Sequence, residues 1–146
     1  MRLHHIAAAM IALGFAIPAQ ASSLSPSAII DQLSAQGYDL RGISCQSGAC
    51  AVMVHEPGDG ITRILVNANN GQPVKNARLG HVSAMVPDGG LTGRDAMALV
   101  AKAGYGDLIS MSFEDGTYGL KAKAGDGKMA SFQVDAVSGA MTKTAD

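Results

Sequence analysis

Residues 110–135, SMSFEDGTYGLKAKAGDGKMASFQVD, alternate apolar and polar side chains in three short runs. Such a period of two is typical of strands that bury one face of a sheet. The runs are separated by Asp115-Gly116 and Asp126-Gly127, and these dipeptides favour tight hairpin turns. The stretch therefore predicts three antiparallel strands with one apolar and one polar face.

A short helix is predicted on the N-terminal side of this sheet. Thr92 is suited to cap it, and Gly104 is suited to end it in a left-handed conformation. Between them, apolar residues recur at helical spacing, namely Ala96, Met97, Val100 and Ala101. A helix this short needs the apolar face of a sheet to pack on. The pattern predicts a helix covering three antiparallel strands.

The same pattern occurs earlier in the chain, where residues 27–74 resemble residues 94–142. Gly37-Tyr38 matches Gly104-Tyr105 at a spacing of 67 residues, and the later matches fall at 68. These later matches keep their chemistry, and they are Gly48 with Gly116, Val52 with Leu120, Ile64 with Phe132, Val66 with Val134, and Gly71 with Gly139. Self-similarity at a fixed period indicates a duplicated unit. The predicted fold class is therefore α+β, with two repeats, each a helix packed on a small three-stranded antiparallel β-sheet.

The N-terminus has the features of a secretory signal peptide. A basic start is followed by an uncharged apolar run of about a dozen residues, then by Pro18 and Ala19-Gln20-Ala21, an A-x-A cleavage site. That run is short for a membrane-spanning helix, and no later segment is apolar enough to span a membrane. The predicted organisation is a signal peptide at 1–21, a first repeat at 22–76, a connector at 77–90 and a second repeat at 91–146. Export to the periplasm is expected.

Composition excludes some classes of partner. Charged residues make up 16% of the chain, with 11 Lys and Arg residues and 12 Asp and Glu residues. Without a basic excess, nucleic acid is not an expected partner. Hydrophobic residues make up 47%, which is the reverse of the composition of disordered chains.

When the two repeats are aligned with a shift of 68 residues, the two cysteines, Cys45 and Cys50, match Phe113 and Tyr118. Those positions face each other across a predicted hairpin turn, and cross-strand Cα separations of about 4.5 to 5.5 Å suit a disulfide. An exported chain meets an oxidising compartment, so a structural disulfide is predicted. Redox use is disfavoured because a C-x-x-C at a helix N-terminus is lacking.

The first repeat departs from the second on its outer sheet face. Met53 and Leu65 place two large apolar side chains where the second repeat has polar ones. An exposed apolar pair of this kind marks a contact surface. We expect this face to be covered either by residues 75–90, which carry Leu79, Val82, Met85 and Val86, or by a partner. Met53 and Leu65 are the candidate interaction surface.

No catalytic, metal-binding or cofactor-binding set is predicted. His55-Glu56 begins like the zinc-peptidase motif H-E-x-x-H, but Pro57 follows and no second His completes it. No G-x-S-x-G context places a serine beside a base. The stretch Gly125 to Lys128 lacks the frame of a phosphate loop. The sequence therefore predicts no enzyme and no cofactor.

A helix ending in Gly-Tyr, a hairpin, and an apolar strand running into Asp and a turn Gly together resemble the PepSY domain. The ending appears as residues 134–139, VDAVSG, and again as residues 66–71, VNANNG, with Asn67 in place of the Asp. The resemblance implies tandem copies over nearly all of the exported chain, a helix on a small antiparallel sheet, and a non-catalytic role outside the cytoplasm. PepSY domains occur in propeptides of thermolysin-like metallopeptidases, and no catalytic residues come with the resemblance.

The expected function is a non-catalytic exported binding or regulatory module that modulates a periplasmic peptidase. The alternative is an envelope structural or stress-related interaction protein without inhibitory activity. A protein partner is expected in both cases.

Overall fold

The computed structural model describes residues 22–56, 60–82 and 90–144, with side chains described throughout except at 75–78 and 81–82. In the first half, a helix is followed by four strands, which are α1 (Pro26–Ala35), β1 (Asp39–Gln46), β2 (Ala49–Glu56), β3 (Gly60–Asn67) and β4 (Pro73–Val82). The second half repeats this order as α2 (Gly93–Lys102), β5 (Asp107–Glu114), β6 (Thr117–Lys123), β7 (Met129–Asp135) and β8 (Met141–Thr144).

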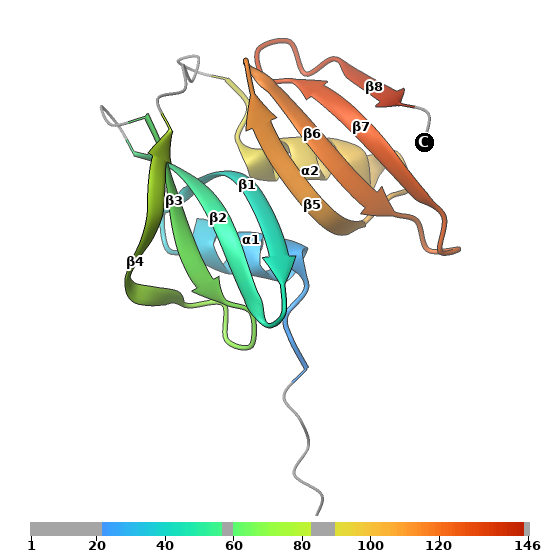
Figure 1. Ribbon diagram of the computed structural model, residues 1–146. Helices are drawn as coiled ribbons and strands as arrows, with labels where there is room; N and C mark the ends of the chain where they lie inside the picture. The colour runs from blue at the N-terminus through green and yellow to red at the C-terminus, as the bar shows by residue number, and fades with distance from the viewer. Residues whose placement is uncertain (1–21, 57–59, 83–89, 145–146) are drawn as a thin grey trace, which may run out of the picture.

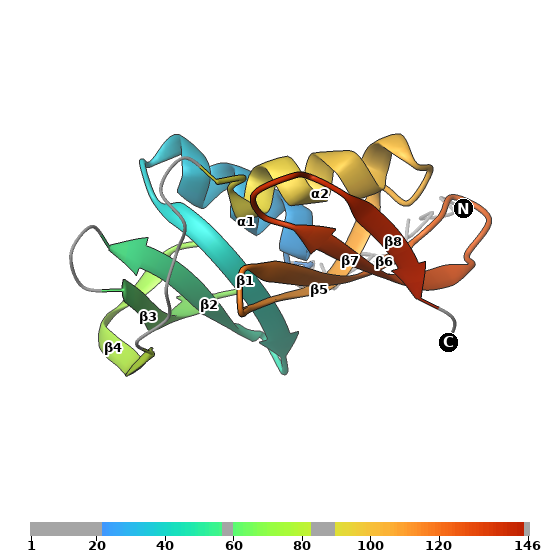
Figure 2. The ribbon, with the colours of Figure 1, turned by 90° about the horizontal axis from the view of Figure 1, so that it is seen from above.

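The strands form one sheet, in the order β4-β3-β2-β1-β5-β6-β7-β8 (Figure 1). All neighbouring strands are antiparallel, and the two halves join where β1 pairs with β5 through Ile43 and Met111. Ile43 and Met111 are 68 residues apart, so the pair that joins the halves consists of equivalent positions. Both helices lie on the same side of the sheet (Figure 2).

The predicted fold of two helices on separate three-stranded sheets is wrong. The described strands make a single eight-stranded sheet, and each half contributes a fourth strand. An isolated three-stranded sheet would leave the backbone groups of its first strand unpaired at an edge, and pairing β1 with β5 satisfies them. The alternation of side chains predicted which residues face the core, but it carries no information about the neighbour across an edge.

The helices form for the local reasons expected from their sequences. In α1, Ser25 Oγ accepts a hydrogen bond from Ala28 N at 3.2 Å, and Pro26 occupies the first turn. In α2, Thr92 and Asp95 form a reciprocal capping box. The faces toward the sheet are buried, at Ile29, Ile30 and Leu33 in α1 and at Gly93, Ala96 and Val100 in α2. These faces and the covered side of the sheet make one continuous core.

Bulges and turns repeat between the halves as the helices do. The register of β1 with β2 shifts between Leu40 and Gly42, and that of β5 with β6 shifts between Leu108 and Ser110. These positions are again 68 residues apart. The predicted turn at Asp115-Gly116 is confirmed, because both residues have the positive φ of a tight hairpin, 49° and 73°. No helix in the described part of the chain has the length and apolar character needed to span a membrane.

Candidate functional site

The side of the sheet away from both helices is called the open face here. Along β2, Cys50, Val52 and Val54 are buried toward the helices. The residues between them point the other way, so Met53 lies on the open face. The pairing of β2 with β3 puts Arg63 and Leu65 on the same side as Met53, although Ile61, which pairs with His55 on that side, is fully buried. Neither helix crosses this side (Figure 2).

Met53 and Leu65 both lie on the open face and are partly exposed. Met53 pairs with Arg63 on β3 and with Gly42 on β1, and Leu65 pairs with Ala51. A Cβ on Gly42 would stand 2.8 Å from Met53 Sδ, so the Met53 thioether lies across Gly42. Met53 therefore packs over β1 and is also packed against the buried core.

The equivalent positions in the second half are polar. Lys121 corresponds to Met53 and Gln133 corresponds to Leu65, each 68 residues later. Lys121 and Gln133 are exposed on β6 and β7, as residues on a solvated sheet face are. The two halves thus share a backbone arrangement, and their open faces differ in chemistry.

The connector expected to cover Met53 and Leu65 is only partly described. Its first part belongs to β4, which extends the sheet beside β3, and Leu79 on that strand is 51% exposed. Met85 and Val86 lie outside the described residues. Cover of Met53 and Leu65 by residues 75–90 therefore stays a prediction.

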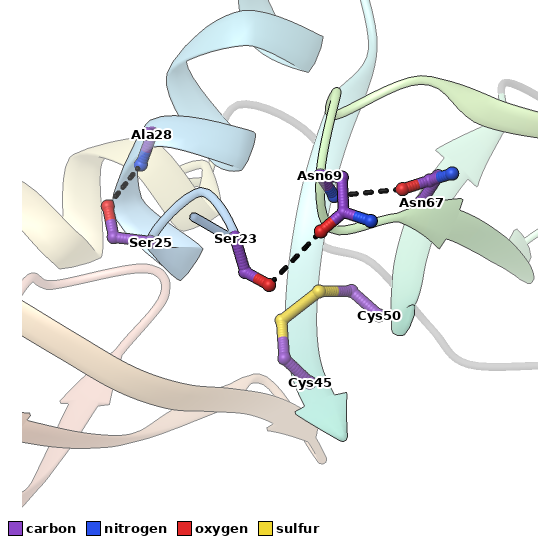
Figure 3. The surroundings of a disulfide bond; sticks show 7 residues. All are labelled: Ser23, Ser25, Ala28, Cys45, Cys50, Asn67 and Asn69. Atoms are coloured by element: carbon purple, nitrogen blue, oxygen red, sulfur yellow. Dashed lines mark hydrogen bonds between the residues drawn. A yellow bond between two sulfur atoms is a disulfide. The ribbon is translucent and has the colours of Figure 1, made fainter. Parts of the chain in front are cut away.

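The predicted disulfide between Cys45 and Cys50 is confirmed. The two residues are a cross-strand pair of β1 and β2 with a Cα–Cα distance of 4.0 Å. Cys50 is fully buried, and Cys45 is exposed at the end of its strand. Figure 3 shows the bond beside the segment leading into α1, where Ser23 Oγ donates a hydrogen bond to Asn69 Oδ1 at 3.2 Å. The disulfide fits a chain that folds in an oxidising compartment.

A buried polar cluster joins the two halves, and sequence analysis did not identify it. Arg41, only 4% exposed, donates from Nη1 to Leu91 O at 2.9 Å and to Tyr118 Oη at 2.8 Å. Its Nη2 donates to Asp39 Oδ2 at 2.9 Å, and His55 Nδ1 lies 3.0 Å from the same oxygen. The cluster connects β1 and β2 with β6 and with the residue that precedes the α2 cap.

One signal in the sequence could have identified this cluster. Arg41 stands between Leu40 and Gly42 in an otherwise apolar strand, and the second half has Ile109 at the matching position. A cation in a buried strand needs a partner from elsewhere in the fold. Comparison with the second half therefore identifies Arg41 as a charged residue at a position that is otherwise apolar. Its partners, Tyr118 and Leu91, become apparent only from the tertiary structure.

Burial raises the pKa of Tyr118 to about 12, and the charge and hydrogen bond of Arg41 only partly offset this effect. The phenol therefore stays protonated at neutral pH and donates to Leu91 O at 2.7 Å. A protonated, hydrogen-bonded phenol and a paired guanidinium stabilise the contact between the halves. The protonated phenol of Tyr118 is not a general base at neutral pH.

The chemistry of the remaining polar groups is limited. Among the described residues, no group of three or more His, Cys, Asp or Glu side chains could hold a metal ion. His55 lies in β2, where a strand cannot bring the residues of a helical zinc motif onto one face. Asp126 is a turn residue, as predicted, because its Oδ1 accepts from Lys128 N at 3.0 Å. Asp59, whose sequence context likewise predicts a turn residue, lies outside the described residues.

A shallow cavity of about 220 Å³ lies where α1 ends and α2 begins, and its lining includes Tyr38, Asp39 and Arg94. The cavity is smaller than the roughly 300 to 1,000 Å³ of typical small-molecule sites. Two of its charged groups are already paired, since Arg94 Nε lies 3.2 Å from Asp31 and Asp39 binds Arg41. The open face is therefore the better candidate for the functional surface.

Comparison of the chain with protein-family models, with curated proteins and with solved structures found no match.

Proposed function

We propose that this chain is an exported, non-catalytic protein-binding module that contacts its partner through the open face around Met53 and Leu65. The observation that carries the proposal is the difference between the two halves. Met53 and Leu65 are partly exposed at positions where the second half has Lys121 and Gln133. Since the duplicate folds with polar residues there, its strands pair without apolar side chains at these positions. A contact surface explains why large apolar residues occupy these positions.

A periplasmic peptidase is the partner class that we propose, on the basis of the resemblance to PepSY domains. The disulfide and the expected signal peptide at residues 1–21 support export. N-terminal sequencing of the protein from a periplasmic fraction tests this part, and a chain that begins at Ser22 is the expected result.

The double variant Met53→Lys, Leu65→Gln tests the binding surface. It gives the first half the residues that the second half already carries, so the chain should still unfold in a cooperative thermal transition, and a melt of the variant checks this before binding is compared. The immobilised protein would be used to capture partners from a periplasmic extract, and each captured protein would then be purified and titrated directly. We expect the double variant to bind the purified partner at least about tenfold more weakly.

The matched control is Met141→Lys, Val137→Gln. These residues are 39% and 72% exposed in and before β8, away from Met53, and the substitutions make the same chemical changes. The control should bind like the wild type. If both double variants bind the partner equally well, the open face around Met53 is not the binding surface.

Peptidase turnover with and without the protein separates regulation from simple binding. A captured peptidase whose turnover falls on addition of wild type, but not of Met53→Lys, Leu65→Gln, supports a regulatory module. A partner that binds through this surface without any change in peptidase turnover supports the alternative, an envelope interaction protein.

A further inference from the structure

Small residues occupy the centre of the open face. The strand registers place Gly42 and Ser44 of β1 beside Ser110 and Ser112 of β5, and Gly119 of β6 pairs with Ser112. We call these five residues the floor. Larger side chains border it on both sides, with Met53 and Arg63 in the first half and Lys121 in the second. The floor leaves room for the side chains of a bound segment.

The two cations that border the floor are available for binding. Arg63 on β3 and Lys121 on β6 are both exposed on the open face, and neither has a hydrogen bond or ion pair with any residue that the structure describes. An exposed cation of this kind gains a favourable interaction when a partner supplies an anion.

Most of the acidic groups that the structure describes near these cations are already engaged. Asp39 accepts hydrogen bonds within the Arg41 cluster, and Asp107 lies 3.6 Å from Lys123 Nζ. Glu114 is exposed, but it lies at the end of β5 beside the hairpin turn. Residues paired across neighbouring strands form rows that run across the open face. The two rows that contain Arg63 and Lys121 hold no acidic residue among those described. Their other members are apolar, small or neutral, namely Ala51, Met53, Leu65, the floor, Ser131 and Gln133.

We propose that the open face takes an acidic, apolar segment of a protein partner, which lies across the floor from β3 to β6. Its carboxylates pair with Arg63 at one side and Lys121 at the other, and its apolar side chains pack on Met53 and Leu65. This proposal rests on the proposed function and adds the chemistry of the partner. Four strand spacings of about 4.8 Å separate β3 from β6, so the two cations stand roughly 20 Å apart along the sheet.

The proposal gives the continuous sheet a role in binding. Arg63 belongs to the first half and Lys121 to the second, and only the pairing of β1 with β5 places them on one surface. Neither half would offer both cations by itself. A segment of about six extended residues covers the distance between them.

The test uses a synthetic peptide of about ten residues with Glu at positions 2 and 8, Leu at positions 4 and 6 and Ser elsewhere, so that Glu and Leu face the same side of the extended chain, with matched peptides in which Gln or Lys replaces both Glu. Binding to the full exported chain would be followed by NMR titration of backbone amides. We expect the Leu–Glu peptide to shift amides of β3, β2, β1, β5 and β6, and to bind at least about tenfold more tightly than the Leu–Gln peptide. We expect its affinity to fall as salt is raised.

Charge reversals locate the binding. Arg63→Glu and Lys121→Glu should each weaken binding of the Leu–Glu peptide by roughly tenfold. The matched control is Lys102→Glu, an exposed cation on α2 at the other side of the sheet, which should leave binding unchanged. A Leu–Glu peptide that does not bind, that binds no better than the Leu–Gln peptide, or that responds equally to all three reversals would overturn the proposal.

These outcomes are distinct from failure of the proposed function. If Met53→Lys, Leu65→Gln abolishes partner binding while the charge reversals leave it unchanged, the open face binds a partner that is not acidic. If the Met53→Lys, Leu65→Gln variant binds the partner normally, the proposed function itself fails.

Discussion

At the scale of single residues, the contact between the halves depends on a few side chains that the repeat does not share. Arg41 replaces the apolar residue found at the matching position, and its hydrogen bonds reach Tyr118 and the Leu91 carbonyl in the other half. The guanidinium also lies over the Phe113 ring, 5.8 Å from its centroid. A buried cation with this many partners is costly to disrupt, because removing any partner leaves a buried polar group unsatisfied.

Tyr118→Phe removes one hydroxyl from this cluster with little change in volume. Arg41 Nη1 then keeps only Leu91 O, and we expect the free energy of unfolding to fall by about 1 to 2 kcal/mol. Urea denaturation of the wild type and the variant measures this difference in the free energy of unfolding. Tyr38→Phe is the control, because Tyr38 is 37% exposed and its hydroxyl makes no hydrogen bond with any described residue. An equal effect of both substitutions would contradict the role given to Tyr118.

Gly93 allows α2 to approach β1 closely. A Cβ at this position would stand 2.5 Å from Leu40 O and 2.6 Å from Met111 Cε. We expect Gly93→Ala to lower the free energy of unfolding by about 1 to 3 kcal/mol, because a backbone carbonyl cannot yield as a flexible side chain can. Gly125→Ala is the control, since its added Cβ would meet no atom within 4 Å. Thermal melts of both variants would show a lower midpoint for Gly93→Ala alone if the close approach matters.

At the scale of elements, the two hairpins on either side of the β1–β5 contact use different means to hold the same geometry. The first hairpin closes with Cys45–Cys50, and the second has a ring pair at the matching positions, Phe113 and Tyr118, with centroids 4.9 Å apart. The outermost strands are protected in different ways. β8 is four residues long, whereas β4 begins with Pro73 and has irregular register with β3. Short, irregular or proline-containing edges discourage uncontrolled pairing with other chains.

Reduction of the disulfide should weaken the fold without abolishing it. The bond closes a loop of only a few residues, for which the chain-entropy estimate is about 2 kcal/mol. We expect the urea midpoint to fall when dithiothreitol is added, while the far-ultraviolet spectrum of the protein without urea stays that of the native sheet. The variant Cys45→Ala, Cys50→Ala should show no response to dithiothreitol. An unchanged midpoint for the reduced wild type would contradict a stabilising role for the bond.

At the scale of the whole molecule, the duplication produces one body. The sheet is continuous across β1 and β5, the helices cover the same side, and the buried residues of both halves form one cluster. The Arg41 cluster adds polar contacts across the same boundary. A shared core and shared backbone hydrogen bonds couple the stability of the halves.

The chain should therefore unfold in a single cooperative transition. Differential scanning calorimetry is expected to give one peak, with a van't Hoff enthalpy close to the calorimetric enthalpy. Gly93→Ala, which weakens the contact between the halves, should shift the whole peak to lower temperature. Two resolved transitions in the wild-type protein would show that the halves unfold independently and would contradict the coupling.

Several local features could be predicted from the sequence, namely the capped helices, the alternating strands, the hairpin turn at Asp115-Gly116 and the pairing of Cys45 with Cys50. Each depends on residues close together in the chain, or on a match between the halves at a fixed spacing. The tertiary structure decided that β1 pairs with β5, that the halves share one sheet, and that Arg41 binds Tyr118 and Leu91. It also brought Arg63 and Lys121 onto one face. These features depend on edges and on contacts between distant segments, and an alternating pattern specifies the face of a strand without specifying its neighbour.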